Sequence, residues 1–182
     1  MKITQEFEKN TREVDEKIAN VTTTYLENLH EESIISSNGT NVSTESGVFR
    51  LSTNAVSREG DLQQTVTNNI ATSNGIKEIM KYNVVEEGQK TGKNAIKLLT
   101  AAKPLSGKMN LVMDPSLVGV FVHEAFGHAC EADGIITKNS ILHDKLNTKV
   151  GVEEISITDD PTIPGLRGTF SYDSEGTKAV KR

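Results

Sequence analysis

The feature that most restricts the fold of this chain is a long run of strand-like sequence around Asn38-Gly39. Residues 20–56 are rich in β-branched side chains, and residues 49–55 alternate between two faces in the order Phe-Arg-Leu-Ser-Thr-Asn-Ala. Asn-Gly is a strong signal for a tight turn between two antiparallel strands. The run therefore predicts an antiparallel meander. Residues 62–72, which follow the turn-like Glu59-Gly60-Asp61, predict a further strand.

Two segments with helical periodicity flank this β-rich region. The first 19 residues predict an amphipathic helix, because apolar residues recur among charges at Ile3, Phe7, Val14 and Ile18. Residues 82–103 predict a second helix, whose small and apolar face is formed by Val85, Gly88, Gly92, Ala95, Ile96, Leu99 and Ala102. Each glycine costs about 1 kcal/mol of helix propensity relative to alanine, so we expect the two glycines to permit close packing on a sheet.

A third segment begins after Pro104, which is expected to end the second helix. Residues 108–114 form a short apolar run that predicts a strand, and Asp114-Pro115 has the pattern of an N-cap followed by a proline in the first helical position. The helix that starts there is expected to reach Asp133. The predicted fold class is thus α+β: an antiparallel sheet with covering helices in residues 1–104, then a β–α unit in residues 105–182.

Composition indicates a piece of a longer, two-domain protein and excludes two classes of partner. Hydrophobic residues make up only 35% of the 182, with no Trp, which is a thin core for a complete domain. The 25 acidic residues outnumber the 20 basic ones, and the basic ones are scattered, so we expect no nucleic-acid partner. The charged N-terminus and the lack of long apolar runs predict a cytoplasmic protein without a membrane partner. The single Cys130 excludes an internal disulfide.

The most specific motif is His-Glu-Ala-Phe-Gly-His at residues 123–128, on the predicted helix from Pro115. Residues four apart lie about 40° apart around a helix axis, whereas residues five apart lie about 140° apart. His123 and His128 can therefore converge only if the helix contains a π-type turn or a kink, which we place at Gly127.

With that insertion, His123 and His128 could both present imidazole nitrogens to Zn²⁺, and Glu124 could act as general base on a metal-bound water. The apolar first half of the helix is expected to hold His123 and Glu124 in a buried position. The plainer interpretation is a pair of hydrogen-bonded buried histidines beside a surface glutamate.

The sequence "HEAFGHACEAD", with "GTFSYDSEGT" further on, resembles the TldD/PmbA family of metallopeptidases, in particular its TldD branch. The resemblance implies that His123 and His128 bind zinc and that Glu124 is the catalytic base. It also implies a third ligand, a cysteine, beyond Arg182. The implied activity is zinc-dependent hydrolysis of short or unfolded peptides, by a homodimer or a heterodimer with a related subunit.

Several nearby residues are candidates for additional ligands. Glu131 could brace a histidine from the second coordination shell or be a helix-end charge, and Cys130 could replace the missing ligand or be a small buried hydrophobe. His143 and His30 are expected to be exposed, although His143 remains a local candidate. Asp133, followed by a glycine, is expected to mark the end of the helix.

Two other functions stay open for this chain. It could be a non-catalytic binding or assembly module, or a modulator of DNA gyrase that acts on the protein. With two ligands alone, the 182 residues are expected to bind zinc poorly and to show little peptidase activity. We also expect a poorly covered apolar face around Val118, Val122 and Phe126, with self-association or partial disorder after about residue 134.

Overall fold

The computed structural model describes residues 2–182, which divide into two compact units. The first unit runs to Lys103 and includes Thr158–Arg182, and the second is Pro104–Ile157. The first unit contains α1 (Lys2–Arg12), β1 (Ile18–Ile35), β2 (Asn41–Glu59), β3 (Leu62–Thr72), α2 (Ile76–Ile79) and α3 (Val84–Leu99). The second contains α4 (Pro115–Val122), a π-helical turn η1 (His123–Gly127), a 3-10 turn η2 (His128–Cys130) and α5 (Ala132–Ile136).

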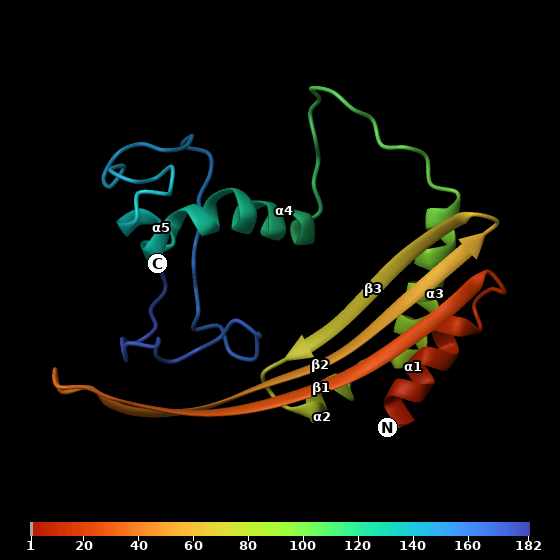
Figure 1. Cartoon of the computed structure of the whole chain (residues 1–182), viewed down its shortest axis with the longest axis horizontal. Helices are drawn as coiled ribbons and strands as arrows, with labels where there is room; N and C mark the ends of the chain where they lie inside the picture. The colour runs from red at the N-terminus through yellow and green to blue at the C-terminus, as the bar shows by residue number, and fades with distance from the viewer. Residues whose placement is uncertain (1) are drawn as a thin grey trace. The chain divides into compact units, whose positions relative to one another are not determined.

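The three strands form one antiparallel sheet in the order β1-β2-β3, which confirms the predicted meander (Figure 1). The turn between β1 and β2 contains Gly39, and the two-residue turn between β2 and β3 contains Gly60; both glycines have positive φ, 96° and 58°. Each predicted turn is therefore where the backbone requires a residue without a side chain. The mixed fold class, α+β with helices on an antiparallel sheet, is confirmed.

Helices α1 and α3 pack side by side on one face of the sheet (Figure 1). That face takes alternate residues of β2, of which Leu51, Thr53, Ala55 and Ser57 are fully buried. One core cluster consists of Phe7, Phe49, Leu51, Ile70, Ile79 and Val84, and a second of Ile18, Val21, Ala55 and Ala95. The alternation in the sequence therefore corresponds to the two faces of the sheet: one set of alternate residues lies in the core, and the other set lies on the opposite face.

The two glycines of the predicted helix face are buried, but they face helix α1, whereas Ala95 on the same face packs against Ala55 of the sheet. A Cβ added to Gly88 would lie 3.0 Å from the carbonyl oxygen of Phe7, and one added to Gly92 only 2.6 Å from that of Thr11. The two glycines therefore let α1 and α3 approach each other closely. The expectation of close approach is confirmed, and its partner is corrected.

The first helix is shorter than the sequence predicts. It ends at Arg12, and Ile18, which the periodicity places on its apolar face, instead begins β1 and is buried in the core. Residues 13–17 form the turn between them, in which the backbone N–H of Lys17 donates to Asp15 Oδ1 at 2.8 Å. A run of apolar residues at helical spacing can extend past the end of a helix into a strand. A residue at the boundary can fit both the 3.6-residue period of a helix and the two-residue period of a strand.

Residues 158–182 contain little regular structure but are joined to the sheet of the first unit. The carbonyl oxygen of Gly165 accepts bonds from the Thr72 hydroxyl at 3.3 Å and from the Ser73 N–H at 3.5 Å, at the end of β3. Near the C-terminus, Tyr172 and Lys178 form an isolated antiparallel bridge. The chain therefore returns to the first unit after the second unit.

The second unit lacks the strand predicted before α4, whereas the predicted start of α4 is confirmed. Residues 108–114 are not a strand, because no segment within residues 2–182 forms a β-ladder with them. The predicted N-cap is confirmed: Asp114 Oδ1 accepts from the Ser116 N–H at 2.8 Å, and Pro115 is the first helical residue. No residue between Pro104 and Ile157 is buried. No helix within the described residues 2–182 is both long and apolar enough to cross a membrane.

Candidate metal centre

The helix that starts at Pro115 changes geometry at the motif. The α-helical turns end at Val122, and His123–Gly127 form a π-helical turn, in which the N–H of His128 bonds to the carbonyl of His123. This inserted residue is the distortion that the five-residue spacing requires. Gly127 lies within the turn but has ordinary helical dihedral angles, φ −55° and ψ −52°, so a glycine is not needed there for the backbone.

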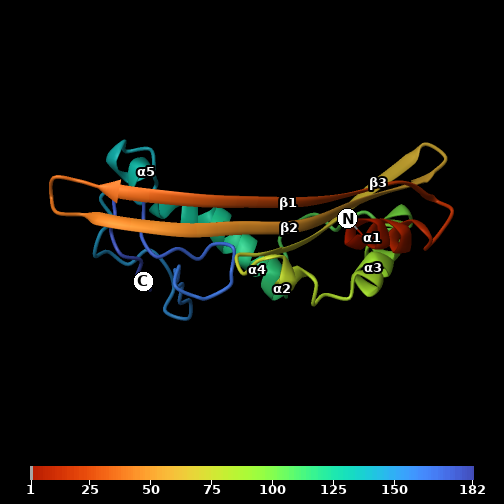
Figure 2. The ribbon, with the colours of Figure 1, turned by 90° about the horizontal axis from the view of Figure 1, so that it is seen from below.

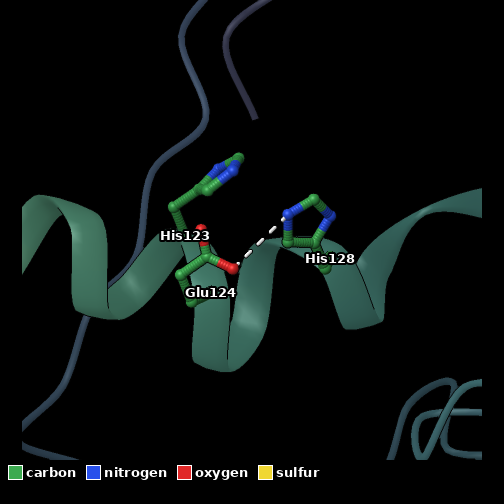
Figure 3. Close-up of side chains that lie close together, drawn as sticks. All are labelled: His123, Glu124 and His128. Atoms are coloured by element: carbon green, nitrogen blue, oxygen red, sulfur yellow. Dashed lines mark ion pairs between the residues drawn. The ribbon is translucent and has the colours of Figure 1, made fainter.

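The π-turn brings the three motif side chains to one side of the helix (Figure 3). One potential ligand atom each from His123, Glu124 and His128 lies within 4.8 Å of the others. The two imidazole centroids are 4.5 Å apart, with their planes inclined at 62°. Tetrahedral zinc with bonds of about 2.0–2.1 Å separates two nitrogen ligands by roughly 3.3 Å, so small rotamer changes would complete the geometry. The residues therefore fit a zinc ion.

His128 is oriented by two carboxylates. Its Nδ1 lies 2.9 Å from Glu131 Oε1, whereas its Nε2 lies 3.7 Å from Glu124 Oε2 (Figure 3). A carboxylate on one ring nitrogen leaves the other nitrogen for a metal and fixes the ring orientation. Both interpretations of Glu131 are compatible with this position. It follows the last residue of the 3-10 turn, as a helix-end charge would, and its carboxylate contacts His128, as a bracing residue would.

The motif side chains are exposed, which contradicts the expected burial. The side chains of Glu124 and His128 are 65% and 50% exposed, and within the second unit α4 contacts only the π-turn that follows it. The sequence pattern correctly shows an apolar helix, but burial depends on other segments that pack on it, and a short pattern does not specify them.

The other candidate residues lie outside the three-residue cluster. Cys130 is exposed rather than buried, and it is not part of the metal-ligand group. His30 is exposed as expected, on the sheet of the first unit. His143 is partly covered rather than exposed; its Nδ1 lies 3.2 Å from the carbonyl oxygen of Ile135 and its Nε2 lies 3.0 Å from Asp144. Its ring is thus occupied by other partners.

The predicted helix end at Asp133 is wrong. The long helix finishes at Cys130, Glu131 is extended with ψ 130°, and Asp133 and Gly134 lie inside the short α5. The Asp-Gly pair suggested a C-terminus, but Gly134 does not adopt positive φ. The break falls instead at Glu131, directly after the 3-10 turn.

Two family models together cover almost the whole chain. The model described as the PmbA/TldA metallopeptidase central domain matches residues 1–101, and the one described as the PmbA/TldA metallopeptidase C-terminal domain matches residues 106–182.

Curated relatives carry names of the same kind. A metalloprotease of Methanothermobacter thermautotrophicus is 37% identical over 90% of this chain, and one of Methanocaldococcus jannaschii is 34% identical over 92%. A zinc metalloprotease TldD homolog of Saccharolobus solfataricus is 30% identical over 85% of the chain. The chain spans only 36%, 37% and 34% of the length of these three relatives.

Solved structures show the same fold. A Bacteroides thetaiotaomicron protein, described as a candidate modulator of DNA gyrase, has a TM-score of 0.75 and 25% identity over 98% of this chain and 41% of its own. A Thermotoga maritima protein with a similar description has a TM-score of 0.76 at 20% identity, covers 100% of this chain and is matched over 41% of its own, which supports the fold alone. With the metal-ligand cluster on the π-turn, these matches establish that the chain belongs to the TldD/PmbA family of metallopeptidases.

Proposed function

We propose that these residues are part of a zinc-dependent peptidase that hydrolyses short or unfolded peptides. The observation that carries this proposal is the convergence of His123, Glu124 and His128 across the π-turn, since histidines five apart on a regular helix would face different directions. The naming of a relative as a zinc metalloprotease supports the choice of zinc.

In this proposal His123 and His128 are the two zinc ligands from this helix. Imidazole nitrogen is a preferred ligand for zinc, and the bond between His128 Nδ1 and Glu131 leaves His128 Nε2 for the metal. Zinc, when bound, supplies Lewis acidity that polarises a peptide carbonyl and makes water more acidic. Glu131 is a positioning residue, because it acts through His128.

Glu124 is the proposed general base. Its carboxylate takes a proton from the water that attacks the peptide carbonyl, and it returns a proton to the leaving amine nitrogen as the C–N bond breaks. Its position next to His123 and 3.7 Å from His128 Nε2 keeps it at the edge of the site. A carboxylate in this place could also be a third ligand, so its role needs a variant that separates the two.

The site needs at least one more protein ligand. Catalytic zinc sites have three protein ligands and one open position, and the cluster supplies two histidines besides the base. We propose a cysteine outside residues 1–182 as the third ligand, together with a partner subunit that completes a dimer. The activity is accordingly proposed for a protein of the full length of the relatives, and this chain alone is expected to bind zinc weakly.

Zinc content tests the ligands. In the protein at the length of its relatives, His123→Ala and His128→Ala should each abolish stoichiometric zinc, whereas His143→Ala should retain it as the matched control. Glu131→Gln should lower zinc affinity by roughly 10- to 100-fold, as for other residues that orient a ligand. Full zinc occupancy in both histidine variants would exclude the proposed site.

Peptide hydrolysis tests the base. Glu124→Gln should keep zinc and lose turnover, because the amide cannot accept the proton. Loss of zinc in this variant would instead make Glu124 a ligand, and unchanged turnover would remove it from the mechanism. Equilibrium dialysis of the 182-residue chain should show weak binding; tight one-to-one zinc would mean that Cys130, Glu131 or His143 completes the site.

A further inference from the structure

The hairpin of β1 and β2 continues well past the end of β3 (Figure 2). The last residue of β3, Thr72, pairs with Phe49, whereas β1 and β2 stay paired as far as Ile35 and Asn41. We call residues 26–48 the arm and residues 41–48 of β2 the free edge. Within residues 2–182, the free edge has a strand partner only on the β1 side, and no other backbone hydrogen bond reaches it.

The free edge has few of the features that protect exposed strands from pairing. Such edges are commonly blocked by proline, by lysine or by a β-bulge. The sequence of residues 41–48, Asn-Val-Ser-Thr-Glu-Ser-Gly-Val, contains neither proline nor lysine. The register of β1 and β2 is continuous along the arm, since its one irregularity lies between Ile18 and Asn20. The edge is therefore ready to accept another strand.

A cleft of about 870 Å³ lies beside the free edge within the first unit. One wall comes from Leu29–Glu32 and Thr44–Val48 of the arm with the adjoining Phe49, and the other from Arg167 and Thr169–Tyr172. Peptides that add to an exposed strand gain main-chain hydrogen bonds, and neighbouring pockets select their alternate side chains. The cleft offers such a pocket next to the unpaired backbone.

The charge of the arm indicates which segment would bind. The arm carries Glu27, Glu31, Glu32 and Glu45 and no Lys or Arg. Glu31 and Glu45 are directly opposite each other in the strand register, an arrangement that destabilises a strand pair unless a cation lies nearby. Arg167 belongs to the other wall of the cleft. The arm itself is thus an anionic surface, and within the cleft a single arginine faces it.

We propose that the free edge binds an extended segment of a partner protein that carries Lys or Arg at alternate positions. The segment would add to β2 where β3 stops, as a fourth strand along the arm. Because alternate residues of a strand face the same side, basic residues at every second position would all lie on the side of Glu31 and Glu45. The interaction is separate from the proposed metal site and involves none of its residues.

Binding of a defined peptide to the 182-residue chain tests the charge. The probe is a capped, fluorescein-labelled peptide, Lys-Val-Lys-Thr-Lys-Val, and its control is Glu-Val-Glu-Thr-Glu-Val. Anisotropy should rise with the lysine peptide alone, and the affinity should fall as NaCl increases from 0.05 to 0.5 M, because salt screens exposed charges. Equal binding of both peptides would overturn the charge complementarity.

Variants of the chain locate the contact. Glu31→Gln and Glu45→Gln should each weaken the lysine peptide by about two- to fivefold, the usual size of an exposed charge pair. Glu16→Gln, which lies outside the arm, is the matched control and should leave the affinity unchanged. An equal loss in all three variants would show a net-charge effect and overturn the assignment to the arm.

Methylated peptides test strand addition itself. The lysine peptide with N-methyl groups on alternate residues exists in two versions, and only one blocks the amides that face β2. That version should bind at least about tenfold more weakly, because two or three ladder hydrogen bonds are lost. Similar affinities for both versions, or self-association of the chain without peptide binding, would overturn the proposal; the second result would assign the edge to another copy.

Discussion

The two compact units contain comparable apolar segments but differ completely in burial. In the first unit Phe7, Leu51, Ala55, Ile79 and Ala95 are 0% exposed. In the second unit the apolar α4, Pro-Ser-Leu-Val-Gly-Val-Phe-Val, buries no residue, and Phe121 is 56% exposed. The difference is one of partners: α3 packs against both α1 and the sheet, whereas within the second unit α4 touches only the turn that follows it.

The second unit therefore shows which of its features depend on neighbouring residues in the sequence and which depend on packing by distant segments. The cap at Asp114, the proline at Pro115 and the π-turn at His123–Gly127 depend on residues within a few positions, and all of them form although no core surrounds them. An apolar helix without a polar face normally belongs inside a larger core. The metal-ligand geometry is thus a local property here, and the enclosure of the site is not.

The strongest test of this contrast compares two phenylalanines. Phe7→Ala should destabilise the first unit by about 3–5 kcal/mol, because it removes a fully buried ring and leaves a cavity. Phe121→Ala, at an exposed position of α4, should change the free energy of unfolding by no more than about 0.5 kcal/mol. Urea denaturation followed by circular dichroism measures both. A large effect of Phe121→Ala would show that α4 packs on other chain segments in solution.

A smaller effect is expected from the same substitution at two helical glycines. Gly92→Ala places a Cβ 2.6 Å from both the Thr11 carbonyl oxygen and a methyl of Val14, so α1 must move away from α3. We expect a loss of about 1–3 kcal/mol despite the better helix propensity of alanine.

Its matched control is Gly119→Ala in α4, where the added Cβ meets nothing within 4 Å. There the substitution should stabilise the helix by up to about 1 kcal/mol. Thermal unfolding should thus shift in opposite directions for the two variants. Shifts of the same sign would contradict the close approach of α1 and α3.

The same separation explains which features the sequence could predict. Strand alternation, the Asn-Gly turn, the N-cap and the π-turn follow from short patterns, so each was found at the correct residues. The strand at 108–114 and the burial of His123 depend on segments that pair or pack from elsewhere, and a short pattern carries no information about them. Ile18 was misassigned because one apolar residue fits both a helical and a strand period.

The candidate site shows the same division. The convergence of His123, Glu124 and His128 could be predicted, because their spacing allows it only with one inserted residue. The lack of a third strand beside residues 41–48 could not, since a strand pattern does not state which strands pair. That the motif helix would end at Cys130 was also hidden, because Asp133-Gly134 is a stronger end signal in sequence than any residue before it.

The third prediction concerns the pH dependence of α4. Bonds from the Ser116 hydroxyl and N–H hold the pKa of Asp114 below its ordinary value of 3.8. Stability from a carboxyl with a lowered pKa is fully present above the ordinary value and is lost as pH falls through the folded value. The helix should therefore fray in acid below about pH 4, and Asp114→Ala should fray it at neutral pH.

Hydrogen exchange of the α4 amides, such as that of Val118, measures this fraying. Asp160→Ala is the matched control: its pKa is also lowered, by bonds from Thr162, but it caps no helix. The control should leave exchange in α4 unchanged. Protection of the α4 amides that is the same at pH 3 and pH 7 would contradict the capping role.

The smallest effect is expected where the first unit itself lacks a core, in the arm. Glu45→Lys replaces a like-charge pair with an opposite-charge pair across from Glu31, and should stabilise the arm by about 0.2–1 kcal/mol. Slower hydrogen exchange at residues 28–34 would measure this gain, while exchange at Leu51 stays governed by the core. Glu16→Lys, with the same change in charge outside the sheet, is the control. An equal gain in the control would mean that net charge, rather than the cross-strand pair, determines the stability of the arm.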